Sequence, residues 1–196
     1  MIPQVRRLRI HTRVPLAAPD LVTKERLEAL RAAEKKLVVA LHVNHARELS
    51  PDAKAAMARL QDAGAGLLSQ TVLLKGVNDD ATTLDALLDA LEAQGVEPYY
   101  LHHPDLAKGT AHFRLSLARG GRIYEALARL RQAKPLPLYV LDLPGGFGKV
   151  PIEAPHLVRA GDGSWRARDR FGIEHRYEED AEAPVERQAP DYAFDF

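Results

Sequence analysis

The sequence predicts an α/β fold of parallel βα repeats followed by a small β extension, and three features indicate this fold. Short β-branched or aliphatic runs alternate with helical patterns, with a Pro, Gly, Ser or Asp at each junction. Most of these runs are too continuously apolar for a sheet with one face in water, so helices are expected to cover a parallel sheet. Beyond Pro151 the runs shorten and polar turns separate them, which is typical of a β-meander.

The expected strands of the βα part cover residues 5–13, 36–43, 66–74, 97–103 and 136–142. Strands and helices in this order fit either a doubly wound sheet or part of a βα barrel, and periodicity does not choose between the two. A complete eight-fold barrel needs a longer chain. In both architectures ligands bind at the C-terminal ends of the strands, so polar residues at those ends are the candidates for function.

Capping residues predict four helices between these strands. The expected N-terminal residues are Thr23, Ser50, Asp79 or Asp80, and Ser116. The third helix is the most regular, because four leucines before Gly95 recur at helical spacing. In the fourth, Leu127 and Leu130 are expected to face the core.

The chain divides into three expected parts. Residues 1–152 form the βα part, and residues 153–180 form the small β extension. Residues 181–196 are rich in Pro, Ala and acidic side chains, with aromatic residues mostly at the end, so this segment is expected to be a mobile tail.

Composition narrows the possible functions. Lys plus Arg and Asp plus Glu both total 27, so no net charge attracts nucleic acid or an anionic membrane. The sequence has neither a signal-peptide core nor the roughly 20 consecutive apolar residues that cross a bilayer, and we expect a cytoplasmic location. Cysteine is absent, which excludes disulfides, thiolate zinc sites and an iron–sulfur cluster held by thiolates of these residues.

Histidine and amide side chains occupy the ends of the second and third strands. His42 and Asn44 share one face of a regular strand, and His45 lies on the other. Ordinary hydrogen bonding is favoured over metal ligation for these histidines, because no third ligand is near in sequence. We therefore expect no metal site. Gln70 lies among apolar residues, and either a ligand or a loop backbone would satisfy its amide.

Two acids and a lysine follow the last two strands. Asp105 comes directly after Pro104, which ends sheet pairing, so Asp105 is placed to point into the strand-end crevice. Asp142 ends an apolar strand, and a Pro-Gly-Gly-Phe-Gly loop then leads to Lys149. The glycines allow the backbone to approach a ligand, but Val150 stands where a Walker phosphate loop has Ser or Thr. A desolvated lysine that condenses with an aldehyde and a surface lysine after a tight turn are both consistent with this pattern.

Four stretches of the chain together resemble the lysine 2,3-aminomutase family of radical S-adenosylmethionine enzymes. They are "LHVNH", "SQTVLLKGVND", "PYYLHHPDLAKGTAHFR" and "YVLDLPGGFGKVPI". The resemblance covers nearly everything from about Leu8 to Ile152 in the family's order, and the trailing segment is similar to the family's C-terminal extension. It implies that residues 1–152 form a radical-SAM-type partial TIM barrel.

The resemblance also implies roles for individual residues. Lys149 corresponds to the lysine that binds pyridoxal phosphate through its amine. Asp105 and Asp142 correspond to the acids that hold the ammonium at the far end of an L-lysine substrate. Two carboxylates suit that task, because a cation between them relieves their mutual repulsion.

Three further residues match the surroundings of the cofactors. His42 and Gln70 correspond to positions that line the cavity for S-adenosylmethionine and pyridoxal phosphate. Arg13, at the end of the first strand, is a weaker candidate for binding an anionic group of either cofactor.

The chain departs from the family at the 4Fe-4S cluster. The family binds this cluster through three cysteines spaced Cys-x-x-x-Cys-x-x-Cys, and none is present here. We therefore expect the C-terminal half of a family member, inactive alone in moving the α-amino group of lysine to the β-carbon. A cluster-bearing N-terminal half is the expected partner, and open sheet edges suggest self-association.

Two alternatives stay open. Close relatives act in modifying elongation factor P with β-lysine, although the pair of acids favours free lysine as the substrate. The chain could also be a non-catalytic remnant that binds pyridoxal phosphate or a lysine-like ligand.

Overall fold

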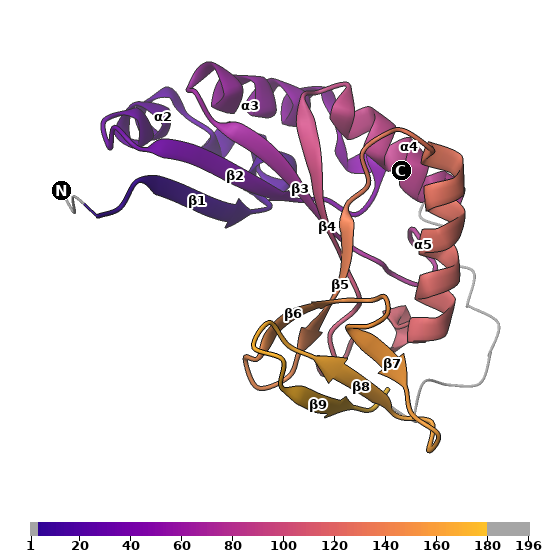
Figure 1. Ribbon diagram of the computed structural model, residues 1–196. Helices are drawn as coiled ribbons and strands as arrows, with labels where there is room; N and C mark the ends of the chain where they lie inside the picture. The colour runs from indigo at the N-terminus through magenta and orange to yellow at the C-terminus, as the bar shows by residue number, and fades with distance from the viewer. Residues whose placement is uncertain (1–3, 180–196) are drawn as a thin grey trace.

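The computed structural model describes residues 4–179 and contains a curled six-stranded sheet with helices along its outer, convex side (Figure 1). The strand order is β1-β2-β3-β4-β5-β6, so the strands are neighbours in space in the order in which they occur in sequence. Helices cover only one side, which is the arrangement of a barrel and not of a doubly wound sheet. The predicted α/β half-barrel is therefore confirmed.

The strands of the large sheet are β1 (Arg7–Thr12), β2 (Lys36–His42), β3 (Gly66–Val72), β4 (Val96–His102), β5 (Leu138–Leu143) and β6 (Gly148–Pro151). The first five are parallel, and β6 turns back to pair antiparallel with β5. The C-terminal ends of the parallel strands therefore lie at one edge, and the β5–β6 turn lies beside them.

The connecting helices are α1 (Val14–Ala17), α2 (Lys24–Arg31), α3 (Pro51–Asp62), α4 (Ala81–Glu92) and α5 (Leu117–Arg131), with 3-10 turns η1 (Pro19–Leu21), η2 (Ala46–Glu48) and η3 (Ala111–Phe113). The side chains of Thr23, Ser50, Asp80 and Ser116 accept hydrogen bonds from backbone N–H groups at the starts of the four longer helices. These caps confirm the predicted helix starts and resolve the choice between Asp79 and Asp80.

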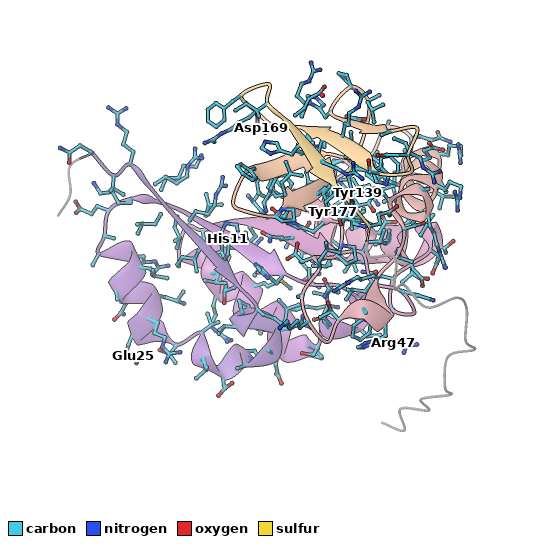
Figure 2. The ribbon with its side chains drawn as sticks, turned by 90° about the horizontal axis from the view of Figure 1, so that it is seen from below. His11, Glu25, Arg47, Tyr139, Asp169 and Tyr177 are labelled. Atoms are coloured by element: carbon cyan, nitrogen blue, oxygen red, sulfur yellow. The ribbon has the colours of Figure 1, made fainter. Side chains whose placement is uncertain are left out.

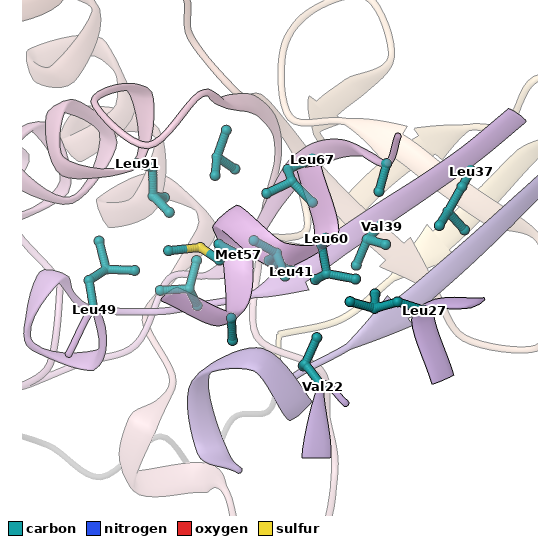
Figure 3. Packing of buried hydrophobic residues seen from close by; sticks show 14 of the residues in the cluster. Val22, Leu27, Leu37, Val39, Leu41, Leu49, Met57, Leu60, Leu67 and Leu91 are labelled. Atoms are coloured by element: carbon teal, nitrogen blue, oxygen red, sulfur yellow. The ribbon is translucent and has the colours of Figure 1, made fainter. Parts of the chain in front are cut away.

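The main core lies between the convex face of the sheet and helices α2 to α4 (Figure 3). Leu37, Val39 and Leu41 on β2 point into it, and Met57 and Leu60 on α3 meet them. Because side chains alternate along a strand, Val38, Ala40 and His42 face the concave side.

The prediction that Leu130 faces the core is wrong, because Leu130 is 54% exposed. The buried stripe of α5 instead runs through Leu117, Gly120, Leu127 and Arg131. The Arg131 guanidinium has no exposed surface and forms ion pairs with three acids on α4, Asp85, Asp89 and Glu92. Arg131 therefore takes the buried position on α5 that the apolar pattern predicted for Leu130.

A second sheet of β7 (Leu157–Arg159), β8 (Trp165–Arg168) and β9 (Glu174–Tyr177) confirms the predicted β-meander. It packs on β5, β6 and the start of α5 through a cluster that includes Leu141, Val150, Leu157 and Tyr177. Asp169 fixes the β8–β9 turn by accepting backbone N–H bonds from Phe171 and Ile173. Residues of this turn line the same pocket as Lys149. The tail predicted over 181–196 lies outside the described residues.

Among residues 4–179, none of the helices has the length and apolar character needed to cross a bilayer.

Candidate active site

His42, Gln70, Asp142 and Lys149 lie on β2, β3, β5 and β6 of the curled sheet, whose helices cover the convex side (Figure 1). Figure 2 shows the same ribbon from below and labels two residues near the candidates, His11 on β1 and Asp169 in the β8–β9 turn. His42 and Gln70 are paired neighbours on β2 and β3. Asp142 and Lys149 are paired neighbours on β5 and β6. Tyr100 and His102 on β4 lie between these two pairs in the strand order. The sheet register therefore arranges polar side chains from distant parts of the sequence in one row.

Lys149 and Asp142 form an ion pair between Nζ and Oδ1. The other carboxylate oxygen of Asp142, Oδ2, lies 2.7 Å from Nδ1 of His102. Burial acts to raise the pKa of Asp142, but the hydrogen bonds from His102 and Lys149 outweigh burial and hold that pKa below its usual value. Asp142 is thus an ionised acid that already binds an alkylammonium group.

A pocket of about 510 Å³ opens next to the Lys149 side chain. Aromatic side chains from β4 and the two turns line it, namely Tyr100, Phe147 and Phe171. Gly146 and Gly148 line it too, and both have positive φ angles, 81° and 95°. Glycine adopts these angles without steric cost, so the turn brings bare backbone to the pocket wall.

Cationic and phenolic groups complete the surroundings of Lys149. The Arg170 guanidinium lines the same pocket and lies 4.7 Å from the centre of the Phe171 ring. The Lys149 Nζ is 5.8 Å from the centre of the Tyr100 ring. A hydrogen bond to Tyr99, followed in importance by burial, raises the pKa of Tyr100 to about 12, so this phenol stays protonated at neutral pH.

The second cluster is built on β1, β2 and β3. The amide oxygen of Gln70 lies 2.9 Å from Nδ1 of His11, so a side chain on β1 contacts this part of the amide. His11 and His42 meet edge to face with ring centres 6.2 Å apart. Burial, followed by the charges of His11 and His102, lowers the pKa of His42, so its imidazole is neutral at neutral pH. Nε2 of His42 is buried and has no hydrogen-bond partner in the part of the chain that the structure describes.

Arg13 lies at the end of β1 and forms an ion pair with Glu48. Glu48 also accepts hydrogen bonds from the backbone N–H groups of Asn44 and His45. Arg13 therefore braces the ends of β1 and β2, and its predicted contact with a cofactor stays a prediction.

Asp105 is exposed in the loop after β4. Within the described residues, no hydrogen bond or ion pair joins it to Lys149 or to Asp142. The structure therefore brings together two of the three residues expected around the substrate ammonium, and the role of Asp105 stays a prediction.

Sequence reasoning missed His102 and His11. His102 was not singled out from the "YYLHH" run, although period-two alternation puts it on the same face as Tyr100. The alternation of side chains along the strands would have placed His102 and His11 near strand ends, beside the candidate residues of the sequence analysis. Among residues 4–179, no group of three or more His, Cys, Asp or Glu side chains is arranged to hold a metal ion.

Comparison of the sequence with known proteins finds relatives with one name. The chain is 36% identical over 178 residues to the L-lysine 2,3-aminomutase of Methanococcus maripaludis, an alignment that covers 91% of the chain and 41% of that relative. It is 38% identical over 152 residues to the L-lysine 2,3-aminomutase of Escherichia coli, which covers 78% of the chain and 44% of that relative. No protein-family model matches the chain.

A third relative gives the same result with lower identity. The chain is 33% identical over 178 residues to the L-lysine 2,3-aminomutase of Clostridium subterminale, across 91% of the chain and 42% of the relative. The chain thus spans less than half the length of the curated relatives that it matches. It belongs to the lysine 2,3-aminomutase family.

Proposed function

We propose that this chain supplies the lysine-bearing part of a lysine 2,3-aminomutase active site. In this proposal Lys149 binds pyridoxal phosphate, Asp142 binds the side-chain ammonium of L-lysine, and Asp105 assists from the neighbouring loop. The observation that carries the proposal is the Asp142–Lys149 ion pair, because Asp142 already binds the same chemical group that ends a lysine side chain.

The residues around Lys149 fit pyridoxal phosphate. The cofactor needs an amine, a wall for an aromatic ring and a positive charge for its phosphate. Lys149 offers the amine, Phe147 and Phe171 offer aromatic surfaces, and Arg170 offers a guanidinium. When bound, pyridoxal phosphate supplies an aldehyde and a ring that delocalises electrons.

His42 and Gln70 are the proposed contacts of S-adenosylmethionine. Nε2 of His42 is a buried nitrogen without a partner among the described residues, and its imidazole is neutral, so it can donate to or accept from a polar group of a ligand. A buried polar atom without a partner costs free energy, which a ligand would recover.

The 4Fe-4S cluster does not fit these residues. The sequence contains no cysteine, and iron–sulfur clusters of this kind are held by cysteine thiolates. In the proposal the cluster is held by a cluster-bearing N-terminal half, and the residues described here bind and orient the substrate and exclude water.

Borohydride trapping tests the cofactor site. The full chain is mixed with pyridoxal phosphate, reduced with borohydride and digested, and the labelled peptide is identified by mass spectrometry. We expect one major label on Lys149, and we expect Lys149→Ala to remove it. Lys54→Ala is the matched control, because Lys54 is exposed on α3, on the opposite side of the sheet. Labelling that is spread over surface lysines and is unchanged in Lys149→Ala would contradict the proposal.

A second candidate function is binding of pyridoxal phosphate or a lysine-like ligand without catalysis, which the absence of cysteine favours. The two are separated by assaying conversion of L-lysine to β-lysine with S-adenosylmethionine and a reductant. The assay is run with and without a cluster-bearing polypeptide from a relative. Activity only with that polypeptide supports the aminomutase proposal. Trapping at Lys149 without activity in either mixture supports the binding function.

A further inference from the structure

We propose that His102 is a positioning residue that holds the Asp142 carboxylate in the orientation that binds an ammonium group. The identity of that ammonium in the working enzyme rests on the function proposed above, whereas the contact between His102 and Asp142 does not. No role for His102 follows from the sequence motifs or from the comparisons.

Exposure increases from His102 outward to the pocket. The His102 side chain is 6% exposed, the Asp142 side chain is 31% exposed and the Lys149 side chain is 35% exposed. Nδ1 of His102 lies 2.7 Å from Oδ2 of Asp142, and Oδ1 of Asp142 faces the Lys149 amine. The imidazole therefore fixes the acid from the buried side and leaves its outer oxygen for a cation.

The rest of the strand holds His102 rigidly. Tyr100, on the same face of β4, meets the His102 ring edge to face with ring centres 5.6 Å apart. The β4–β5 ladder ends at the pairing of His102 with Val140, two residues before Asp142. Histidine and acid are thus diagonal neighbours on adjacent strands, and neither backbone is free to move independently.

Stability alone does not explain a histidine at this position. Nε2 of His102 is buried and has no hydrogen-bond partner among residues 4–179. A buried polar atom left unpaired costs free energy, and an apolar side chain of similar size would avoid that cost. The only polar contact recorded for the ring in the described residues is with Asp142, so the benefit of the imidazole lies in that acid.

The contact also fixes the tautomer of His102. An ionised carboxylate only accepts hydrogen bonds, so Nδ1 must carry the proton that it donates to Asp142. The proposal therefore requires a proton on Nδ1 of His102.

Competitive acetylation measures whether His102 controls the amine. The full chain is pulsed with acetic anhydride at a single pH, and acetylation of Lys149 is quantified by peptide mass spectrometry, with Lys54 as the internal reference. The ion pair with Asp142 engages the Lys149 amine, so Asp142→Asn should raise the acetylation of Lys149 relative to Lys54. His102→Leu should raise this ratio too, because the acid is then free to turn into solvent.

Two comparisons separate positioning from a structural effect. His102→Asn keeps an N–H donor near the place of Nδ1 and should restore the labelling ratio of the unaltered chain. Tyr99, Tyr100, Asp169 and Arg170 also lie around Lys149, and they are the same in every variant. A His102→Leu labelling ratio equal to or below that of the unaltered chain overturns the proposal.

The tautomer gives a test that needs no folded variant. In nitrogen-15 NMR spectra of the unaltered chain, we expect His102 to be protonated at Nδ1. Protonation at Nε2 alone would refute the contact. Acetylation and NMR do not depend on pyridoxal phosphate, so a failure of trapping at Lys149 refutes the proposed function and leaves the positioning role to these measurements.

Discussion

The protonation state of His103, a residue next to the candidate site, depends on its burial. Its side chain follows His102 but faces the helices, where Nδ1 lies 2.9 Å from the hydroxyl of Tyr139. Burial lowers the pKa of His103 to about 4, so the ring is neutral in the folded chain at neutral pH. Two adjacent histidines thus have different tasks, because alternation along β4 sends one to the concave side and the other into the core.

The lowered pKa of His103 predicts a loss of stability in weak acid. The unfolded chain binds a proton at His103 as the pH falls through about 6.5, whereas the folded chain binds it only near pH 4. The free energy of unfolding should therefore decrease as the pH is lowered from about 6.5 to about 4, by about 3 kcal/mol at most. Below pH 4 the contribution of His103 should not change further. Urea unfolding at a series of pH values measures the slope.

The matched variant is His103→Asn, which can keep a hydrogen bond to Tyr139 but cannot titrate. Its unfolding free energy should depend less on pH between 6.5 and 4 than that of the unaltered chain. Equal slopes in the two proteins would show that His103 is protonated while folded.

The sequence predicted part of the residue-scale chemistry. It put Asp142 and Lys149 at the two ends of one glycine loop, and the family resemblance assigned both to one site, whereas their pairing across β5 and β6 is seen in the structure. It did not find the His102–Asp142 contact, because that contact depends on the β4–β5 register and joins residues 40 positions apart. Chain-local patterns carry no information about such a register.

The helices depend on features that the sequence shows only in part. Their starts follow from capping side chains, which act within three residues and are therefore readable from the sequence. The buried face of α5 was not readable, because Arg131 pairs with acids on α4 that lie about 40 residues earlier. Apolar periodicity favoured Leu130, and the ion pairs with α4 explain why the helix turns Arg131 inward.

Gly120 on α5 makes a second contact that periodicity does not show. A Cβ atom built on Gly120 would lie 1.9 Å from the hydroxyl oxygen of Tyr139, whereas one built on Gly121 would meet nothing within 4 Å. The close approach lets α5 pack directly over β5. A glycine pair that weakens the isolated helix therefore serves its docking on the sheet.

These contacts predict opposite effects for two neighbouring substitutions. Gly120→Ala should destabilise the fold by about 1 to 3 kcal/mol, because the methyl group must displace Tyr139. Gly121→Ala, the matched control, should be neutral or should stabilise by up to ~1 kcal/mol through helix propensity. Urea unfolding measures both. Similar destabilisation by the two variants would mean that α5 does not pack on Tyr139 as described.

At the scale of the whole molecule, the half-barrel has one long unpaired edge. β1 is the outer strand of the sheet, and among the described strands it pairs only with β2. The carbonyl oxygen of Arg6 accepts a hydrogen bond from Lys36 on the β2 side. Backbone groups alternate in direction along a strand, so those of Arg7, Arg9 and His11 point to the open edge.

The fold class was predictable from the sequence, whereas the curling of the sheet into a half-barrel was not. Alternating strand and helix patterns predict a parallel sheet, and the caps fix most element starts. Curvature arises from strand tilt and from which side the helices cover, and both are properties of the assembled sheet. The choice between a doubly wound sheet and a half-barrel therefore needed the structure.

The open edge predicts that the chain associates through β1. An unpaired strand is a template for pairing with another strand, so we expect sedimentation velocity to show species larger than a monomer in the micromolar range. Arg9→Pro removes one outward N–H and should shift this equilibrium toward the monomer, because proline cannot donate to an added strand. Arg9→Ala is the matched control: it also removes the side chain that donates to the Tyr99 hydroxyl but keeps the N–H, so it should associate like the unaltered chain. Equal dissociation by the two variants would assign association to the arginine side chain. If the unaltered chain is a monomer at every concentration, the β1 edge does not pair with a second copy of this chain.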